Sequence, residues 1–230
     1  MRQVNHVRLA LWLAVVTTIA AAVFTLWPQI DLAVSRLFYR PGAGFWISDL
    51  PGVEALRHFV WYLSLGVVGF SLAALGLALA GRPIRGFGAR EAAFLLTLYL
   101  LGPGLIVNVI LKAHWGRARP AAIAEFGGSA HFTPALLPAD QCARNCSFVS
   151  GEGSAAVALA IAFVVLVPLA RRLLGRFFPL YVVAAMGLPA AGLVLRVLTG
   201  RHFLSDTVFA ALIVLAIALV LHRVMLSRRP

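Results

Sequence analysis

The sequence has 230 residues, of which 61% are hydrophobic and 12% are charged, and its formal net charge is +12. A soluble domain carries about 25% charged residues, so this chain has too few to cover a globular surface. Intrinsic disorder is excluded as well, because disordered chains are poor in hydrophobic residues. The composition predicts an integral membrane protein, and we expect no nucleic-acid partner despite the basic excess.

Six apolar stretches predict membrane-spanning helices, each of which needs about 20 mostly apolar residues. These stretches are Leu9–Trp27, Phe59–Ala80, Ala92–Leu111, Ser154–Ala170, Phe178–Leu195 and Thr207–Leu221. The first stretch remains apolar for longer than the core of a signal peptide, so we expect an uncleaved helix. The prediction is therefore an all-α bundle of six transmembrane helices, which forms a single domain over residues 1–230.

A shorter amphipathic segment follows the first stretch. Residues Ile30–Tyr39 alternate apolar side chains with Asp31 and Arg36 at helical spacing. A short helix of this kind is typical of the membrane interface, where it lies parallel to the bilayer plane. We expect it at the outer surface, between the first two spans.

The distribution of basic residues predicts the orientation of the bundle, because an excess of Lys and Arg marks the cytoplasmic side. Both termini and the loops 81–91 and 171–177 share one side, which holds eleven arginines and one acid, Glu91. These arginines are Arg2, Arg8, Arg82, Arg85, Arg90, Arg171, Arg172, Arg176, Arg223, Arg228 and Arg229. The other side holds nine basic residues and seven acids. We therefore expect cytoplasmic termini.

Both cysteines fall in the outward-facing loop 112–152, as Cys142 and Cys146. A cysteine pair on the oxidising side of a membrane is most simply a disulfide. The alternative, a metal site, would need two further ligands, and only His131 lies near in the sequence. We expect the disulfide, and we expect it to hold the chain just before Ser147.

Outward basic residues gather in two short stretches, Lys112–Arg119 and Arg196–Arg201, at the ends of the third and fifth spans. The five residues concerned are Lys112, Arg117, Arg119, Arg196 and Arg201. A single arginine at a membrane boundary usually only extends its side chain toward water. That behaviour does not account for two tight clusters. Convergent cations suit an oxyanion such as phosphate. Between the clusters, Ser150 and Gly151 predict a helix N-terminus, which itself binds anions.

His202 and Asp206 stand four residues apart at the start of the sixth span. This spacing predicts that both side chains project from one helical face. A carboxylate beside an imidazole fixes its tautomer and activates it as a nucleophile or a general base. The alternative is an ion pair that only caps the helix.

These residues together resemble a known signature. The pattern Lys112-x6-Arg119-Pro120, then Ser150-Gly151, then Arg196-x5-His202-x3-Asp206 is similar to the three-part motif of the type 2 phosphatidic acid phosphatase superfamily. That family includes bacterial membrane lipid phosphatases, whose six spans and outward-facing motifs match the predicted layout. The resemblance implies that Lys112, Arg119 and Arg196 bind the phosphoryl oxygens. The Ser150 side chain and the Gly151 amide would complete this anion site.

The resemblance also implies a mechanism. His202 would attack phosphorus to form a phospho-histidine, Asp206 would orient the imidazole, and water would then release phosphate. Phosphoryl transfer mainly needs positioning and charge neutralisation, which cationic side chains supply here. We therefore expect an enzyme that needs no metal and no other cofactor.

The second motif departs from the family pattern, because Glu152 stands where the family usually has the histidine that protonates the leaving group. Glu152 could act as this acid if it were protonated, or His114 or His131 could act instead. A leaving group such as the phosphate of a lipid diphosphate would need no strong acid. The remaining alternative is a weakly active or inactive relative. A lesser departure is Leu195, where the third motif usually has Ser.

The sequence thus predicts an integral inner-membrane phosphatase that acts on a lipid phosphate at the periplasmic face. Candidate substrates are lipid A, an isoprenyl diphosphate and a phosphatidyl-type monoester, and the apolar helices and the loops 28–57 and 121–146 would decide among them. Three alternatives remain: a phosphotransferase that passes phosphate to another lipid, a transporter or channel, and a structural protein. The charges gather at one face and the predicted span interiors lack charged residues, which argues against transport. The oligomeric state is not indicated.

Overall fold

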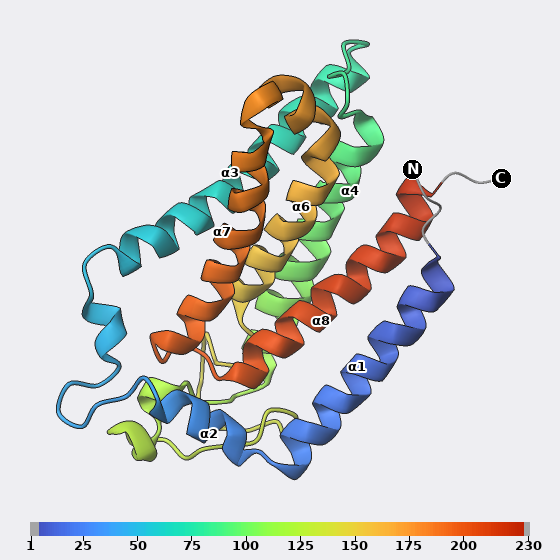
Figure 1. The fold of residues 1–230 in the computed structure, drawn as a ribbon. Helices are drawn as coiled ribbons and strands as arrows, with labels where there is room; N and C mark the ends of the chain where they lie inside the picture. Colours follow the sequence, from blue (N-terminus) through green and yellow to red (C-terminus); the bar gives the residue numbers. More distant parts are fainter. Residues whose placement is uncertain (1–4, 228–230) are drawn as a thin grey trace.

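The computed structural model describes residues 5–227, which fold into a helical bundle without a β-strand in that range (Figure 1). Its helices are α1 His6–Leu26, α2 Gln29–Arg36, α3 Val53–Leu79, α4 Ala89–Tyr99, α5 Lys112–His114, α6 Gly151–Leu174, α7 Phe178–Leu198 and α8 Leu204–Leu221. A π-helical segment, Leu100–Leu111, joins α4 to α5 and contains Pro103. Three of the predicted cytoplasmic arginines, Arg2, Arg228 and Arg229, lie outside the described residues.

Five helical segments of the described chain are long and apolar enough to cross a membrane. They are His6–Leu26, Val53–Leu79, Ala89–His114, Gly151–Leu198 and Leu204–Leu226. The fourth segment has 48 residues and folds back on itself, because Gly175 takes a positive φ of 48° between α6 and α7. The two helices therefore run antiparallel, as Figure 1 shows. The chain is an all-α, multi-pass membrane protein.

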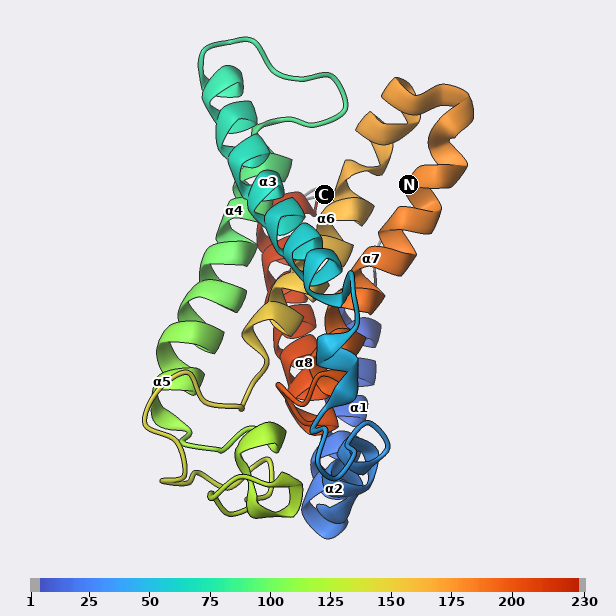
Figure 2. The same cartoon turned by 90° about the vertical axis from the view of Figure 1, so that its left-hand side faces the viewer.

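The loops divide between the two ends of the bundle. The turn between α6 and α7, the loop between α3 and α4, the start of α1 and the end of α8 lie at one end (Figure 1). The opposite end carries α2, the long connection from α5 to α6, and the turn from α7 to α8; Figure 2 shows the same division. The segments that hold the candidate site residues therefore meet at one end of the molecule.

Helix α6 lies at the centre of the bundle and is lined with small residues. Ala155, Ala156, Ala158 and Ala162 are all buried, so neighbouring backbones can approach closely. A Cβ atom on Gly192 of α7 would come within 2.9 Å of side chains on α6 and α3. These small side chains let α3, α6 and α7 pack tightly, and this fixes the end of α6 on which the site is built.

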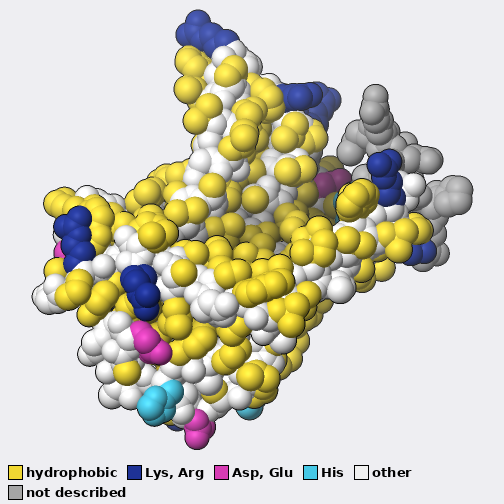
Figure 3. Space-filling view, turned by 60° about the horizontal axis from the view of Figure 1, so that its bottom comes forward, with side chains coloured by type: hydrophobic (Ala, Val, Ile, Leu, Met, Phe, Trp, Pro, Cys, Tyr) yellow, Lys and Arg dark blue, Asp and Glu magenta, His cyan; other side chains and the backbone are white. Residues whose placement is uncertain are grey.

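Helix α1 is packed mainly along α8, and most of its surface is apolar and exposed. The side chains of Trp12 and Ile19, for example, are exposed. Figure 3 shows hydrophobic side chains along the helices, with charged side chains toward the ends. This distribution is expected of a surface that faces lipid along its length and water at its ends.

One sequence prediction needs correction. Helix α8 begins at Leu204, so His202 precedes the helix, and His202 and Asp206 do not project from one helical face. The reason is local: the Asp206 carboxylate accepts the backbone N–H of Phe203 at 2.9 Å, which caps the N-terminus of α8 at Phe203, after His202. The short helix expected near residues 30–39 corresponds to α2, and its Asp31 side chain is buried.

Candidate active site

An open cavity of about 470 Å³ lies where the end of α7, the α7–α8 turn and the start of α3 meet. It is lined by Ser48, Asp49, Glu54, Arg57, Lys112, Arg119, Asn145, Glu152, Arg196, Thr199, Arg201 and His202. The structure thus brings together residues from all three motifs, although they are separated by up to 90 positions in the chain. Five cationic side chains and one histidine line this cavity among the described residues.

The three cations that the resemblance assigns to phosphate all line this cavity. Lys112 is only 7% exposed, and its ammonium group has no hydrogen-bond or ion-pair partner within residues 5–227. Arg119 donates from Nε and Nη2 to the carbonyl oxygen of Asn145, at 3.2 and 2.8 Å, which fixes the plane of its guanidinium. The Nε of Arg196 is buried without a partner. Unsatisfied cationic donors of this kind suit an anionic ligand.

His202 is held as a neutral imidazole with one nitrogen free. Its Nδ1 lies 2.7 Å from the backbone carbonyl oxygen of Ser147. Because a carbonyl can only accept, Nδ1 carries the hydrogen and Nε2 carries the lone pair. Nε2 makes no hydrogen bond in the described part of the chain, and the residue lines the cavity. The free lone pair is what a nucleophilic histidine requires.

The surroundings of His202 favour its neutral form. Burial lowers the pKa of His202 to about 4, and the positive charges of Lys112 and Arg119 act in the same direction. The Asp206 carboxylate, 3.7 Å from Nδ1, opposes this shift. A neutral imidazole is therefore present throughout the physiological pH range.

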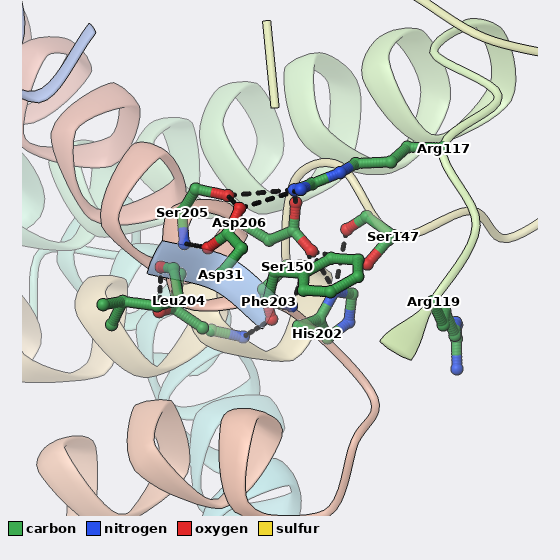
Figure 4. Close-up of polar contacts among 12 residues, drawn as sticks. Asp31, Arg117, Arg119, Ser147, Ser150, His202, Phe203, Leu204, Ser205 and Asp206 are labelled. Carbon is green, nitrogen blue, oxygen red and sulfur yellow. Dashed lines mark hydrogen bonds and ion pairs between the residues drawn. The ribbon is translucent and has the colours of Figure 1, made fainter. Parts of the chain in front are cut away.

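Asp206 belongs to a buried polar network behind His202 rather than to the cavity wall (Figure 4). It is fully buried and accepts hydrogen bonds from the hydroxyl of Ser147 and from Nη1 of Arg117, the latter at 2.6 Å. The Nδ1–H of the imidazole donates its hydrogen bond to the carbonyl oxygen of Ser147, whereas Asp206 lies 3.7 Å from Nδ1. Asp206 therefore orients His202 in part through Ser147, whose hydroxyl and carbonyl contact the two side chains.

Arg117 is the centre of this network and is 0% exposed. Its Nη2 donates to Asp31 at 2.8 Å, and its Nε donates to the backbone oxygen of Thr133 at 2.8 Å. The guanidinium also lies 4.2 Å from the ring centroid of Phe203. Burial raises the pKa of Asp31, and the charge of Arg117 opposes this. No motif assigns Arg117, Asp31 or Ser147 to the site.

The start of α6 differs in detail from the expected anion site. The Ser150 hydroxyl is buried and accepts the N–H of Gly153 at 3.1 Å, so it caps the helix and does not line the cavity. A Cβ on Gly151 would lie 2.6 Å from Oδ1 of Asn108, so the Asn108 side chain would have to shift to admit it. Within the described chain the N–H groups of Gly151 and Glu152 have no partner, as at other helix N-termini that bind anions.

Glu152 faces the cavity and bridges two arginines. One carboxylate oxygen lies 2.9 Å from Nη1 of Arg57, and the other lies 3.0 Å from Nη1 of Arg196. Both oxygens thus serve as acceptors for guanidinium groups. The alternative acids, His114 and His131, are exposed and do not line the cavity.

Arg57 is a site residue that sequence reasoning missed. It lies near the start of α3 and also contacts Glu54, three residues earlier, with Nε 2.8 Å from the carboxylate. The spacing of Glu54 and Arg57 is that of an ordinary surface ion pair on a helix, so it carries no signal for a site. Only the packing of α3 against α6 brings Arg57 to Glu152.

A disulfide joins Cys142 and Cys146. The next residue is Ser147, whose N–H donates to the carbonyl oxygen of Arg117 at 2.8 Å. The cross-link and this backbone hydrogen bond together hold the residue that contacts both His202 and Asp206. The loop from α5 to α6 is therefore part of the site's support.

Comparison with known proteins places this chain among membrane lipid phosphatases. Residues 92–230 match the model of the PAP2 superfamily. The chain is 33% identical to a lipid A 4'-phosphatase of Francisella tularensis subsp. novicida, covering 90% of both chains. It is 34% identical to the protein of that name from Rhizobium leguminosarum, over 87% of this chain and 90% of the relative. For the Rhizobium etli protein of that name, the identity is 35% and these shares are 84% and 82%. No solved structure matches.

Proposed function

The chain belongs to the PAP2 superfamily and is a membrane lipid phosphatase, and we propose that it removes the 4'-phosphate of lipid A through a phospho-histidine at His202. The observation that carries the proposed mechanism is the free Nε2 of His202 at a cavity lined by Lys112, Arg119 and Arg196. The substrate is proposed because three relatives, each similar over most of the chain, bear the name lipid A 4'-phosphatase.

The proposed reaction has two steps. In the first, the Nε2 lone pair of His202 forms a bond to phosphorus, the bond from phosphorus to the lipid oxygen breaks, and that oxygen takes a proton. In the second, the oxygen of water forms a bond to phosphorus, the bond from phosphorus to Nε2 breaks, and a proton of the water passes to the group that protonated the lipid oxygen. Inorganic phosphate leaves and the neutral imidazole is regenerated. Lys112, Arg119 and Arg196 neutralise the charge on the phosphoryl oxygens in both steps, with the free amides at the start of α6 as further donors. The Ser150 hydroxyl contributes by capping that helix.

We assign Glu152 the proton transfer to the leaving oxygen. A 4'-phosphate is a monoester, so its leaving oxygen needs a proton, and Glu152 is the acid on the cavity wall nearest to the phosphate-binding Arg196. Phosphate competes with Glu152 for this arginine. Binding of the phosphoryl group would draw Arg196 away and free one carboxylate oxygen, which can then take a proton from water and pass it to the leaving oxygen.

We further propose six membrane crossings within one domain, with both termini in the cytoplasm and the site at the periplasmic face of the inner membrane. The α6–α7 hairpin supports the even number of crossings, and eleven arginines against Glu91 on the side of the termini support the orientation. The disulfide at the site end also suits an oxidising compartment. A cysteine introduced in place of Arg176 tests this orientation. It should not react with membrane-impermeant thiol reagents in intact cells, and labelling there would show that the orientation is the opposite one.

The decisive experiment is phosphate release by the purified protein from lipid A, from phosphatidic acid and from an isoprenyl diphosphate. We expect release from the 4' position of lipid A, and loss of at least about 1,000-fold in His202→Ala, since a nucleophile is removed. Equal or faster release from the other two lipids would refute the assigned substrate. Activity of His202→Ala close to wild type would refute the phospho-histidine. His114→Ala, at an exposed site outside the cavity, is the control.

The same assay tests Glu152. Glu152→Gln retains an acceptor for arginine but cannot deliver a proton, so kcat should fall by about 100-fold, the usual contribution of a general acid. The loss should disappear with a phosphate ester whose leaving group is already a weak base. Unchanged turnover on lipid A across the pH range would remove Glu152 from the mechanism.

A further inference from the structure

The buried network behind His202 contains three charged groups. Arg117 lies between Asp206, at 2.6 Å from Nη1, and Asp31, at 2.8 Å from Nη2 (Figure 4). All three side chains are at most 1% exposed. Burial makes each charge costly unless an opposite charge or a hydrogen bond compensates it, so the balance among the three is not incidental.

Asp31 is bound as a carboxylate on every side. One oxygen accepts the N–H of Ser205 at 2.9 Å, and the other accepts Nη2 of Arg117 and the hydroxyl of Ser205. These are all donors, so the group serves only as an acceptor. The three charges therefore sum to one net negative charge. Without Asp31, Arg117 would neutralise Asp206 and leave no net charge behind the histidine.

The reaction requires that negative charge. When Nε2 of His202 bonds to phosphorus, Nδ1 keeps its hydrogen, so the ring gains a positive charge while the electron pair of the broken bond leaves with the lipid oxygen. The groups that face the ring are Asp206, 3.7 Å from Nδ1, and the cations Lys112 and Arg119. Because both cations disfavour a charged ring, a compensating charge behind it lowers the barrier.

We infer that Asp31 is a positioning residue of the phosphatase: through Arg117 it keeps the charge of Asp206 available to the imidazolium that forms at His202. Asp31 lies on α2, outside residues 92–230 that match the family model. The short helix that the sequence predicts at the membrane interface thus supplies part of the active site. This inference rests on the proposed phospho-histidine mechanism.

The first test is Asp31→Asn, which keeps the shape and the acceptor oxygen but removes the charge. We expect kcat to fall by about 10-fold, a typical effect of an outer-shell partner, with KM nearly unchanged because the cavity cations are untouched. Glu125→Gln, which removes an exposed carboxylate from the loop between α5 and α6, is the control and should retain full activity. An unchanged kcat in Asp31→Asn would overturn the inference.

The second test separates charge from structure. In Asp31→Asn with Arg117→Met, the net charge behind His202 returns to one negative charge on Asp206. If charge matters, the double variant recovers most of the kcat that Asp31→Asn loses. If the network is only structural, the double variant is slower than either single variant, and the inference fails.

The pH profile gives an independent measure. The neutral ring is the nucleophile, so activity is lost as pH falls through the pKa of His202, which is about 4 in the wild type. Removing the charge of Asp31 favours the neutral ring and moves this acid limb to lower pH, by up to about one unit; restoring the net charge in the double variant moves it back. An acid limb that is identical in all three proteins would contradict the inference. Activity of His202→Ala close to wild type would refute the phospho-histidine mechanism itself, so that failure can be told apart from a failure of the inference about Asp31.

Discussion

The two sets of charges around His202 differ in whether their polar atoms have partners within the protein. On the cavity side, the ammonium of Lys112 has no partner in the described chain and the Nε of Arg196 is buried without one. Behind the ring, Arg117 donates to two carboxylates, a hydroxyl and a carbonyl oxygen. The first set is incomplete until an anion binds, whereas the second is complete in the protein alone.

This difference separates binding from positioning. Lys112, which contacts no carboxylate in the described chain, keeps its charge for a ligand, and it does so at a cost to the folded state, because a largely buried charge without a partner is unfavourable. A saturated network adds no affinity for a ligand, but it fixes Ser147 and Asp206, which in turn fix His202. Variants on the two sides should therefore change different quantities, and the following predictions test that separation.

The largest effect is expected from Arg117→Met. The change leaves Asp31 and Asp206 buried without their shared counterion, so the free energy of unfolding should fall by about 3–5 kcal/mol, the usual loss when one partner of a buried pair is removed. Denaturant unfolding in detergent measures it. Arg144→Met, at an exposed arginine of the neighbouring loop, should stay within about 0.5 kcal/mol of the wild type. An equally small loss in Arg117→Met would show that the network does not hold the site.

Lys112→Met should have the second-largest effect, and on the other quantity. Removing one donor to a phosphoryl oxygen should lower kcat/KM by about 100- to 1,000-fold, or about 2.7–4 kcal/mol. Stability should be unchanged or slightly higher, because the lysine is buried without a partner in the described chain. In a thermal melt, inorganic phosphate should stabilise the wild type but not the variant. A variant that is destabilised as strongly as Arg117→Met would erase the distinction between the two sets.

The sequence predicts the binding side much better than the positioning side. Lys112, Arg119, Arg196 and His202 are recognisable by their spacing, and the structure brings all four to one cavity. The all-α fold and the apolar stretches also follow from composition and length alone, because a spanning helix has few alternatives in lipid. Phosphate binding leaves this signature since it needs specific cations at fixed positions.

The positioning side has no such signature. Asp31 appears in the sequence as the polar face of an amphipathic helix, and the pattern tells which residues share that face but not whether it meets water or protein. In the structure the Asp31 side chain is buried and accepts a hydrogen bond from Arg117. His202 and Asp206 were expected on one helical face, which was wrong because the Asp206 carboxylate caps α8 at Phe203. Such pairings depend on tertiary packing, which spacing along the chain does not contain.

The smallest expected effect is that of the disulfide, which supports the positioning side from outside. Replacing both Cys142 and Cys146 with Ser frees a loop of only five residues, so the free energy of unfolding should fall by about 2 kcal/mol at most. Ser147 follows the cross-link directly and contacts both His202 and Asp206, so kcat should fall by a few-fold while KM stays constant. Steady-state kinetics with and without reductant measure this, and reductant should have no further effect on the double variant. A rise in KM with constant kcat would instead assign the loop to substrate binding, and the boundary between the two sets of charges would have to be redrawn.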